Sequence, residues 1–236
     1  MERVSHQCAT PYFFPAADKE TTRDVEKKFL IDMKTLAARA LLNLAAHPDN
    51  RLIISKKNGV RPLVSLLSMD SVDAQQTAAG ALSNLAMLVP VNSVAFLDAG
   101  AVGKLVPLLK SANAGVRQHA AGALANLAVC PGLLEIIFKT EGAIDGLSLC
   151  LLSTTAATKE NAAEAFANLS KMHKQEIYAN RGVMVNLASL MYDADDGVRV
   201  MARDALLALG CVVKGKDVFV IREIGGEKKT VFLKFV

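Results

Sequence analysis

The chain has 236 residues, of which 52% are apolar and 21% are charged, so it is long enough to bury a sizeable core. Its net charge of +4 comes from 27 basic and 23 acidic residues that are spread along the chain, and a nucleic-acid-binding protein usually gathers its basic residues into a stripe. Because the basic residues are scattered, we do not expect nucleic-acid binding. No apolar run approaches the roughly 20 residues that a membrane-spanning helix needs, so we do not expect direct membrane insertion.

The first 21 residues are expected to form an extended tail. The opening MERVSHQCAT lacks the apolar stretch of a secretory signal, which favours the cytoplasm or the nucleus and leaves an organellar or ciliary assembly open. Two prolines then bracket three adjacent aromatic residues, Tyr12, Phe13 and Phe14, and make a regular helix improbable there. We expect these aromatic side chains to contact either the protein's own first repeat or another protein.

The sequence pattern of residues 22–211 predicts helices that are arranged in a repeating unit. The segment AAGALSNLA at 78–86 returns as AAGALANLA at 120–128, and related segments are LAARALLNLA, AAEAFANLS and ARDALLALG. Each copy except the last carries an asparagine near its end, at steps of 41, 42 and 42 residues: Asn43, Asn84, Asn126 and Asn168. The fifth copy has Ala208 in that place.

A second feature, a series of glycines, repeats with the same period as the asparagines. Glycines recur at steps of 41, 42 and 40 residues, at Gly59, Gly100, Gly142 and Gly182, and each opens an apolar segment such as GAVGKLVPLLK. A glycine there can take the left-handed conformation that ends a helix. The unit therefore predicts a short helix, a second amphipathic helix and a long third helix. Because such helices cannot bury their apolar faces alone, the units must stack into a solenoid.

These features resemble the armadillo-repeat family over roughly residues 35–211. The resemblance rests on the period, the glycine before the second helix, the LVxLL-like second helix and the A-A-G-A-L-x-N-L-A third helix. It implies an all-α fold, a right-handed α-solenoid with about four full repeats and partial ones at its ends. HEAT repeats are the second choice, since they lack the short first helix and its glycine turn.

The resemblance also implies a binding surface. In armadillo proteins the third helices line the concave face, and their asparagines bind an extended peptide, which assigns that role here to Asn43, Asn84, Asn126 and Asn168. A carboxamide both donates and accepts hydrogen bonds, as a peptide bond does. The alternative is that these amides bond to neighbouring turns and only support the solenoid. Tryptophan, which importin-α-like receptors place one turn before the asparagine, is absent, so recognition of that kind is not expected.

One and two turns before the asparagines, or before Ala208 in the fifth copy, five further residues are expected to line the same groove: Arg39, His119, Asn161, Glu164 and Asp204. Their order predicts a groove that runs from basic to acidic. Gly80 and Gly122 lie on the same helices, where each costs about 1 kcal/mol relative to alanine. Either close helix contact or room for a ligand backbone would explain them.

Nothing in the chain indicates catalysis. Residues 210–216 match G-x-x-x-x-G-K, but Asp217 follows where a phosphate-binding loop has Ser or Thr. The four cysteines are far apart and form no C-x-x-C pair, and only Cys8 has a histidine nearby, His6, which argues against a disulfide framework or a metal site. We expect no enzyme, no cofactor and no metal.

The last segment, 212–236, breaks the helical pattern. It is rich in Val, Ile and Phe, and Gly225-Gly226 separate two strand-like halves, which predicts a β-hairpin. Its apolar residues, Phe232 and Phe235 among them, would either cap the last repeat or add a strand to a partner's sheet.

Two functional hypotheses follow. The first is an adaptor or scaffold that binds a protein segment in its concave groove. The second is a fixed structural subunit of a large ciliary, cytoskeletal or organellar assembly, held through its ends and tails. A third, the substrate-binding part of a ubiquitin ligase, is weaker because no U-box-like segment is present.

Overall fold

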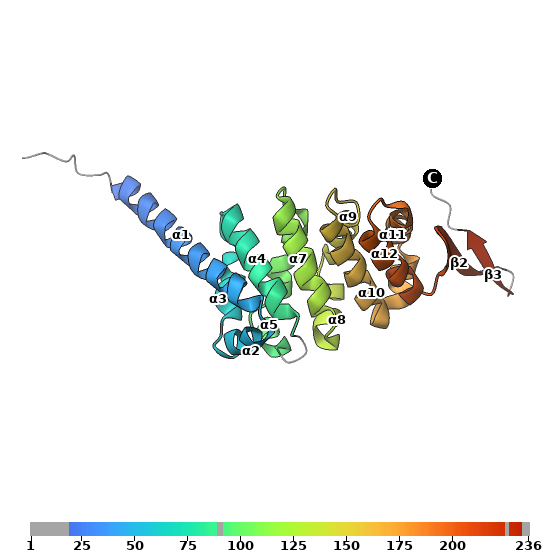
Figure 1. Ribbon diagram of the computed structural model, residues 1–236, viewed down its shortest axis with the longest axis horizontal. Helices are drawn as coiled ribbons and strands as arrows, with labels where there is room; N and C mark the ends of the chain where they lie inside the picture. The colour runs from blue at the N-terminus through green and yellow to red at the C-terminus, as the bar shows by residue number, and fades with distance from the viewer. Residues whose placement is uncertain (1–18, 89–91, 225–226, 233–236) are drawn as a thin grey trace, which may run out of the picture.

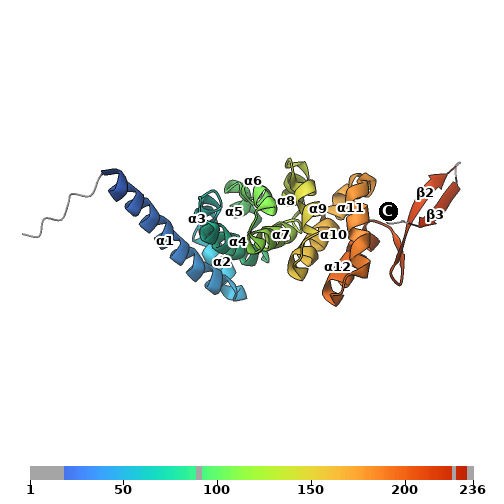
Figure 2. The same cartoon turned by 90° about the horizontal axis from the view of Figure 1, so that it is seen from above.

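The computed structural model describes residues 19–88, 92–224 and 227–232. Helices stack in a single row, with a long first helix projecting at one end and a small sheet at the other (Figure 1). The view from above shows the same order of helices along the long axis (Figure 2).

The first half of the row contains seven helical segments: α1 (Lys19–Ala45), α2 (Pro48–Lys56), α3 (Val60–Leu66), α4 (Val72–Ala86), α5 (Ser93–Asp98), α6 (Ala101–Leu105) and the 3-10 helix η1 (Val106–Lys110). The second half contains α7 (Ala114–Leu127), α8 (Pro131–Lys139), α9 (Ala143–Cys150), α10 (Ala156–Ala179), α11 (Arg181–Ser189), the 3-10 helix η2 (Leu190–Tyr192) and α12 (Asp196–Ala208). The predicted third helices are the second half of α1, then α4, α7, the first half of α10, and α12, and each packs against the next. The solenoid predicted from the repeats is confirmed.

Capping side chains start the third helices. The side chains of Ser71, Asn113 and Asp195 each accept a hydrogen bond from a backbone N–H of the first turn, at 3.3, 3.0 and 2.8 Å. Such caps supply acceptors for N–H groups that have no partner within the helix. Ser71 and Asn113 each lie 13 residues before the asparagine of their repeat, so the repeat carries its own helix-start signal.

The core is built from the small residues of the repeated segment. Its alanines and leucines in α4 and α7 are fully buried, among them Ala78, Leu82, Ala120 and Leu124. Alanine side chains let neighbouring third helices approach closely, while the leucines fill the space toward the second helices. One continuous apolar core runs from Ala38 to Val220.

The glycine turn takes its predicted form in two repeats. Gly100 and Gly142 adopt the left-handed conformation, with φ of 63° and 78°. The prediction is wrong for Gly59, whose φ is −68°, because the neighbouring Asn58 takes the left-handed position with φ 59°. Glycine is still needed at 59, since a Cβ there would lie 2.5 Å from the Ile54 side chain.

The fourth glycine of the series also differs from the prediction. Gly182 is the second residue of α11 and has no left-handed conformation. The start of α11 is fixed instead by Asn180, whose side chain accepts a hydrogen bond from the N–H of Val183 at 3.2 Å. A side-chain cap has replaced the glycine turn in this repeat.

After α12 the chain forms three antiparallel strands in the order β1-β2-β3: β1 (Val212–Lys214), β2 (Asp217–Ile224) and β3 (Glu227–Phe232). The predicted hairpin is confirmed as β2 and β3, in which Phe219 pairs with Phe232. The short strand β1 was not predicted, because three residues are too few to show a pattern. Val218 and Val220 are buried in the same core as the last repeat, so the base of the sheet covers the end of the solenoid.

Candidate functional site

The asparagines of the third helices tie each repeat to the one before it. The side-chain amide of Asn84 donates to the Leu42 carbonyl at 3.3 Å, and that of Asn126 donates to the Ser83 carbonyl at 3.1 Å. Asn168 donates in the same way to the Ala125 carbonyl at 3.1 Å. Each accepting carbonyl lies one residue before the asparagine position of the preceding repeat. The supporting role that the sequence left as an alternative is therefore present.

These bonds use only part of each carboxamide. A carboxamide has two N–H donors and an oxygen with two lone pairs. Among the described residues, the Oδ1 atoms of Asn84 and Asn126 accept no hydrogen bond, and neither is sealed from solvent. Asn43, at the start of the row, is exposed. Because the bond from Nδ2 holds the amide in place, the oxygens of Asn84 and Asn126 are held in fixed directions.

Asn168 differs from the others. Its side chain is 7% exposed, and its Oδ1 accepts a hydrogen bond from Lys171 Nζ at 2.7 Å. Both ends of this amide are used within the protein. We call Asn43, Asn84 and Asn126 the open asparagine row, since Asn168 continues their line but is closed by Lys171.

The glycines of the third helices leave no room for a ligand. An added Cβ at Gly80 would lie 3.2 Å from the Leu42 side chain and 3.4 Å from His119 Nε2. An added Cβ at Gly122 would lie 2.9 Å from Asn161 Nδ2. Side chains of the neighbouring repeats fill both spaces, which agrees with the close-contact explanation.

Two predicted groove residues are therefore part of the packing between third helices. His119 is half-buried beside Gly80, and burial lowers the pKa of its imidazole, which favours the neutral ring. Asn161 donates from its side chain to the Gln118 carbonyl at 3.0 Å. Their side chains border the row and also hold adjacent helices together.

The charges along the row are not arranged as a simple gradient. Arg39 donates to both carboxylate oxygens of Asp73 in α4, at 3.0 and 2.9 Å, so the basic end of the predicted groove is paired. Glu164 is half-buried and Asp204 is exposed, and within the described part of the chain neither forms an ion pair. Among the charged residues predicted to line the groove, the ones without an ion-pair partner are therefore acidic and lie in the C-terminal half of the solenoid.

Asp73 was not among the residues that the sequence singled out. It lies 34 residues after Arg39, so its role depends on how α1 and α4 pack. Of the predicted tail contacts, Tyr12, Phe13, Phe14 and Phe235 lie outside the described residues. Phe232 is 41% exposed, and its ring meets that of Phe219 edge to face at 5.4 Å.

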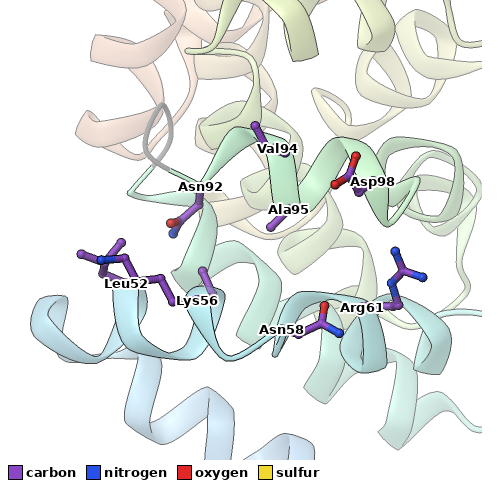
Figure 3. A pocket seen from close by; sticks show the side chains of 9 residues that line it. Leu52, Lys56, Asn58, Arg61, Asn92, Val94, Ala95 and Asp98 are labelled. Atoms are coloured by element: carbon purple, nitrogen blue, oxygen red, sulfur yellow. The ribbon is translucent and has the colours of Figure 1, made fainter.

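A cleft lies away from this row, between α2, α3 and α5 (Figure 3). It has a volume of about 830 Å³ including its open mouth. Its lining combines Lys56 and Arg61 with Asp98, Asn58 and Asn92. This lining is of mixed charge and holds no histidine or cysteine that could act as a nucleophile or a metal ligand.

The buried thiols, the metal-ligating side chains and the helix lengths of the described residues bear on other kinds of site. Burial raises the pKa of the Cys150 and Cys211 thiols to about 11, so both stay protonated and unreactive at physiological pH. No cluster of metal-ligating side chains occurs within residues 19–88, 92–224 and 227–232. Over the same ranges, no helix has the length and apolar character needed to cross a membrane.

Comparison with known proteins supports the architecture. The family model of the Armadillo/beta-catenin-like repeat matches residues 47–87 and 90–129. An engineered protein from a structural genomics consortium is 32% identical, with 76% of this chain and 74% of that one covered and a TM-score of 0.70. A search of curated proteins finds no match.

Designed repeat proteins are also similar. One designed armadillo repeat protein is 26% identical over 74% of each chain, with a TM-score of 0.68. Another, solved in complex with the peptide (KR)4, is 25% identical, covers 82% of this chain and 77% of its own, and has a TM-score of 0.67.

Proposed function

Because this chain belongs to the armadillo-repeat family, we propose that it is a non-catalytic scaffold that binds an extended segment of a partner protein along its open asparagine row. The observation that carries the proposal is the pair of oriented amide oxygens at Asn84 and Asn126, which accept no hydrogen bond from the described residues. Groups held in place before binding lose less entropy when a ligand arrives.

The spacing of the row suits a peptide backbone. Packed helices lie about 8–10 Å apart, and an extended chain advances about 3.3 Å per residue. Each asparagine would therefore meet the partner backbone at about every third residue. Backbone groups are shared by all residue types, so these bonds supply affinity with little sequence preference.

The unpaired carboxylates add a preference for basic residues. Arg39 is neutralised by Asp73, whereas Glu164 and Asp204 have no ion-pair partner among the described residues. A partner with Lys or Arg opposite these carboxylates would gain favourable contacts and faster association. The designed relative that holds (KR)4 supports a basic peptide as the first ligand to test.

The test measures binding of a (KR)4 peptide by titration calorimetry. Replacing Asn84 and Asn126 together by alanine removes two backbone contacts of about 1 kcal/mol each, which weakens binding by about tenfold or more. Reversing the acidic charges, with Glu164→Lys and Asp204→Lys, is expected to weaken binding further and to reduce its dependence on salt.

A matched control separates binding from stability. Asn186 in α11 donates to Ser148 Oγ at 3.0 Å, so Asn186→Ala removes an inter-repeat hydrogen bond away from the row. This variant should keep the affinity of the unchanged protein. Equal affinity in all variants, or no binding of the peptide at all, would count against the proposal.

The second candidate is a structural subunit held through its ends. It is favoured by apolar side chains exposed at both ends of the solenoid, such as Phe29 and Phe232. A subunit of this kind would keep its place in an assembly when Asn84 and Asn126 are replaced and would lose it when the ends are altered. Crosslinking mass spectrometry in the source cell distinguishes the two, because it shows which surface touches the partners.

A further inference from the structure

The first half of α1 stands apart from the rest of the protein. It projects beyond the solenoid in both views (Figures 1 and 2). Every residue from Arg23 to Leu30 is exposed, and Thr35 is the first fully buried residue of the described part of the helix. This stretch therefore receives little support from packing against other elements.

Its exposed surface is apolar along one face. Val25 and Phe29 are each 65% exposed, and Met33 and Leu36 are 49% and 57% exposed. Steps of four, four and three residues place these side chains on the same face of a helix. We call these four residues the α1 stripe.

An uncovered helix of this kind is poorly stable. Isolated helices shorter than about 12–15 residues are marginal in water, and most helical stability in proteins comes from covering an apolar face. A segment that covers the α1 stripe would stabilise it by roughly 25 cal/mol for each Å² of apolar surface removed from water.

We propose that Tyr12, Phe13 and Phe14 of the same chain pack on the α1 stripe. These residues belong to the 18 that precede α1 and lie outside the described part of the chain. The run from 7 to 17, QCATPYFFPAA, contains no charged residue, so it can lie against apolar side chains without burying a charge. Thr10 and Phe14 each precede a proline and are biased toward an extended backbone.

Chain length limits where these aromatic residues can reach. Phe14 lies five residues before Lys19, which allows about 17 Å of extended chain, and Phe29 lies about 15 Å along the helix from Lys19. Tyr12 lies seven residues before Lys19, which allows about 23 Å of extended chain. That is enough to reach Met33, about 21 Å along the helix from Lys19. The extended chain is therefore long enough for the aromatic residues to reach Val25, Phe29 and Met33.

The same lengths exclude most of a neighbouring apolar crevice between α1 and α3, whose outer edge at Lys34 lies about 23 Å along the helix from Lys19. That crevice is lined by Leu41, Leu63 and Leu66 among others. Leu41 lies about 33 Å along the helix from Lys19, which is beyond the reach of Tyr12. The tail can therefore reach the stripe but only the outer edge of the crevice.

The α1 stripe is also aligned with the open asparagine row. Leu36 lies seven residues and Phe29 fourteen residues before Asn43, which places them on the same side of the helix. The contact between the tail and the stripe does not depend on partner binding, so it can be tested without a ligand.

Hydrogen exchange of the full chain, followed by mass spectrometry, tests the contact. In the variant with Tyr12→Ser, Phe13→Ser and Phe14→Ser, amides of residues 23–36 should exchange at least about tenfold faster than in the unchanged protein. Phe29→Ser should produce the same acceleration, and serine and phenylalanine have similar helix propensities. Combining both sets of changes should add nothing further.

Leu44→Ser provides the matched control. Leu44 is 51% exposed on the same helix but lies about 38 Å from Lys19, so exchange at 23–36 should not change. Unchanged exchange in the triple variant would overturn the proposal. An acceleration by Phe29→Ser that depends on protein concentration, together with a dimer in sedimentation, would assign the stripe to a second copy instead.

Discussion

Gly80 and Gly122 occupy equivalent places in α4 and α7 but meet different neighbours. Near Gly80, an added Cβ would approach only the flexible ends of Leu42 and His119. Near Gly122 it would lie 2.9 Å from Asn161 Nδ2, the atom that donates to the Gln118 carbonyl. Glycine is therefore favoured at 122, where a side chain would disturb this hydrogen bond, and only tolerated at 80.

Alanine substitution should separate the two glycines. Alanine favours a helix over glycine by about 1 kcal/mol, so Gly80→Ala is expected to be neutral or to raise the free energy of unfolding. Gly122→Ala displaces the Asn161 amide and loses a hydrogen bond of about 1 kcal/mol, which cancels or outweighs that gain. Urea unfolding followed by circular dichroism measures the difference. Equal stabilisation of both variants would show that the Asn161 bond contributes nothing.

At the scale of an element, α10 combines two helices of the predicted unit. His173 interrupts it with a non-helical backbone at φ −118° and ψ 38°. The ring of His173 stacks on Phe138 of α8 at 3.6 Å, and its Nε2 lies 2.8 Å from Glu135 Oε2. This contact to α8 fixes the direction in which the second half of α10 leaves the bend.

The Glu135 contacts should make stability depend on pH. Hydrogen bonds from Lys139 and His173 hold the pKa of Glu135 below its ordinary value. The stabilisation is therefore present above that ordinary value and is lost as the pH falls through the lowered one. We expect Glu135→Gln to lower the midpoint of thermal unfolding at neutral pH and to lower it by less at about pH 3, because protonation of Glu135 begins below the ordinary pKa of glutamate. A deficit of equal size at both pH values would show that the charge of Glu135 is not involved.

At the scale of the whole molecule, each repeat contacts mainly its neighbours. The third helices α4, α7, α10 and α12 follow one another in contact, and the sheet touches the last of them through β1. Stability in such an array is approximately a sum over repeats and their interfaces. Damage at one end should therefore stay near that end.

Removing residues 212–236 tests this locality. The deletion takes away Val218 and Val220, which are buried in the core at the end of the solenoid. Amides of α12 should then exchange faster, while those of α4 keep the rates of the full chain. Acceleration of similar size in α4 and α12 would mean that the solenoid unfolds as one cooperative unit.

The repeating parts of the fold could be predicted because their signals are local. The alanines, leucines and asparagines of 78–86 and 120–128 do the same work in each copy, and two independent markers shared the period. The candidate site was less predictable. Whether an asparagine is open depends on single residues outside the pattern, such as Lys171, which closes Asn168.

By itself the sequence determined that the chain is a solenoid of armadillo repeats, because a short apolar unit that returns every 40–42 residues can bury its faces only by stacking. Only the tertiary structure decided how the row along that solenoid is charged and where it is open. Arg39 meets Asp73 34 residues away, and each amide bond of the row joins residues 42 or 43 apart. These pairs depend on the rotation and spacing of packed helices, which the period does not specify.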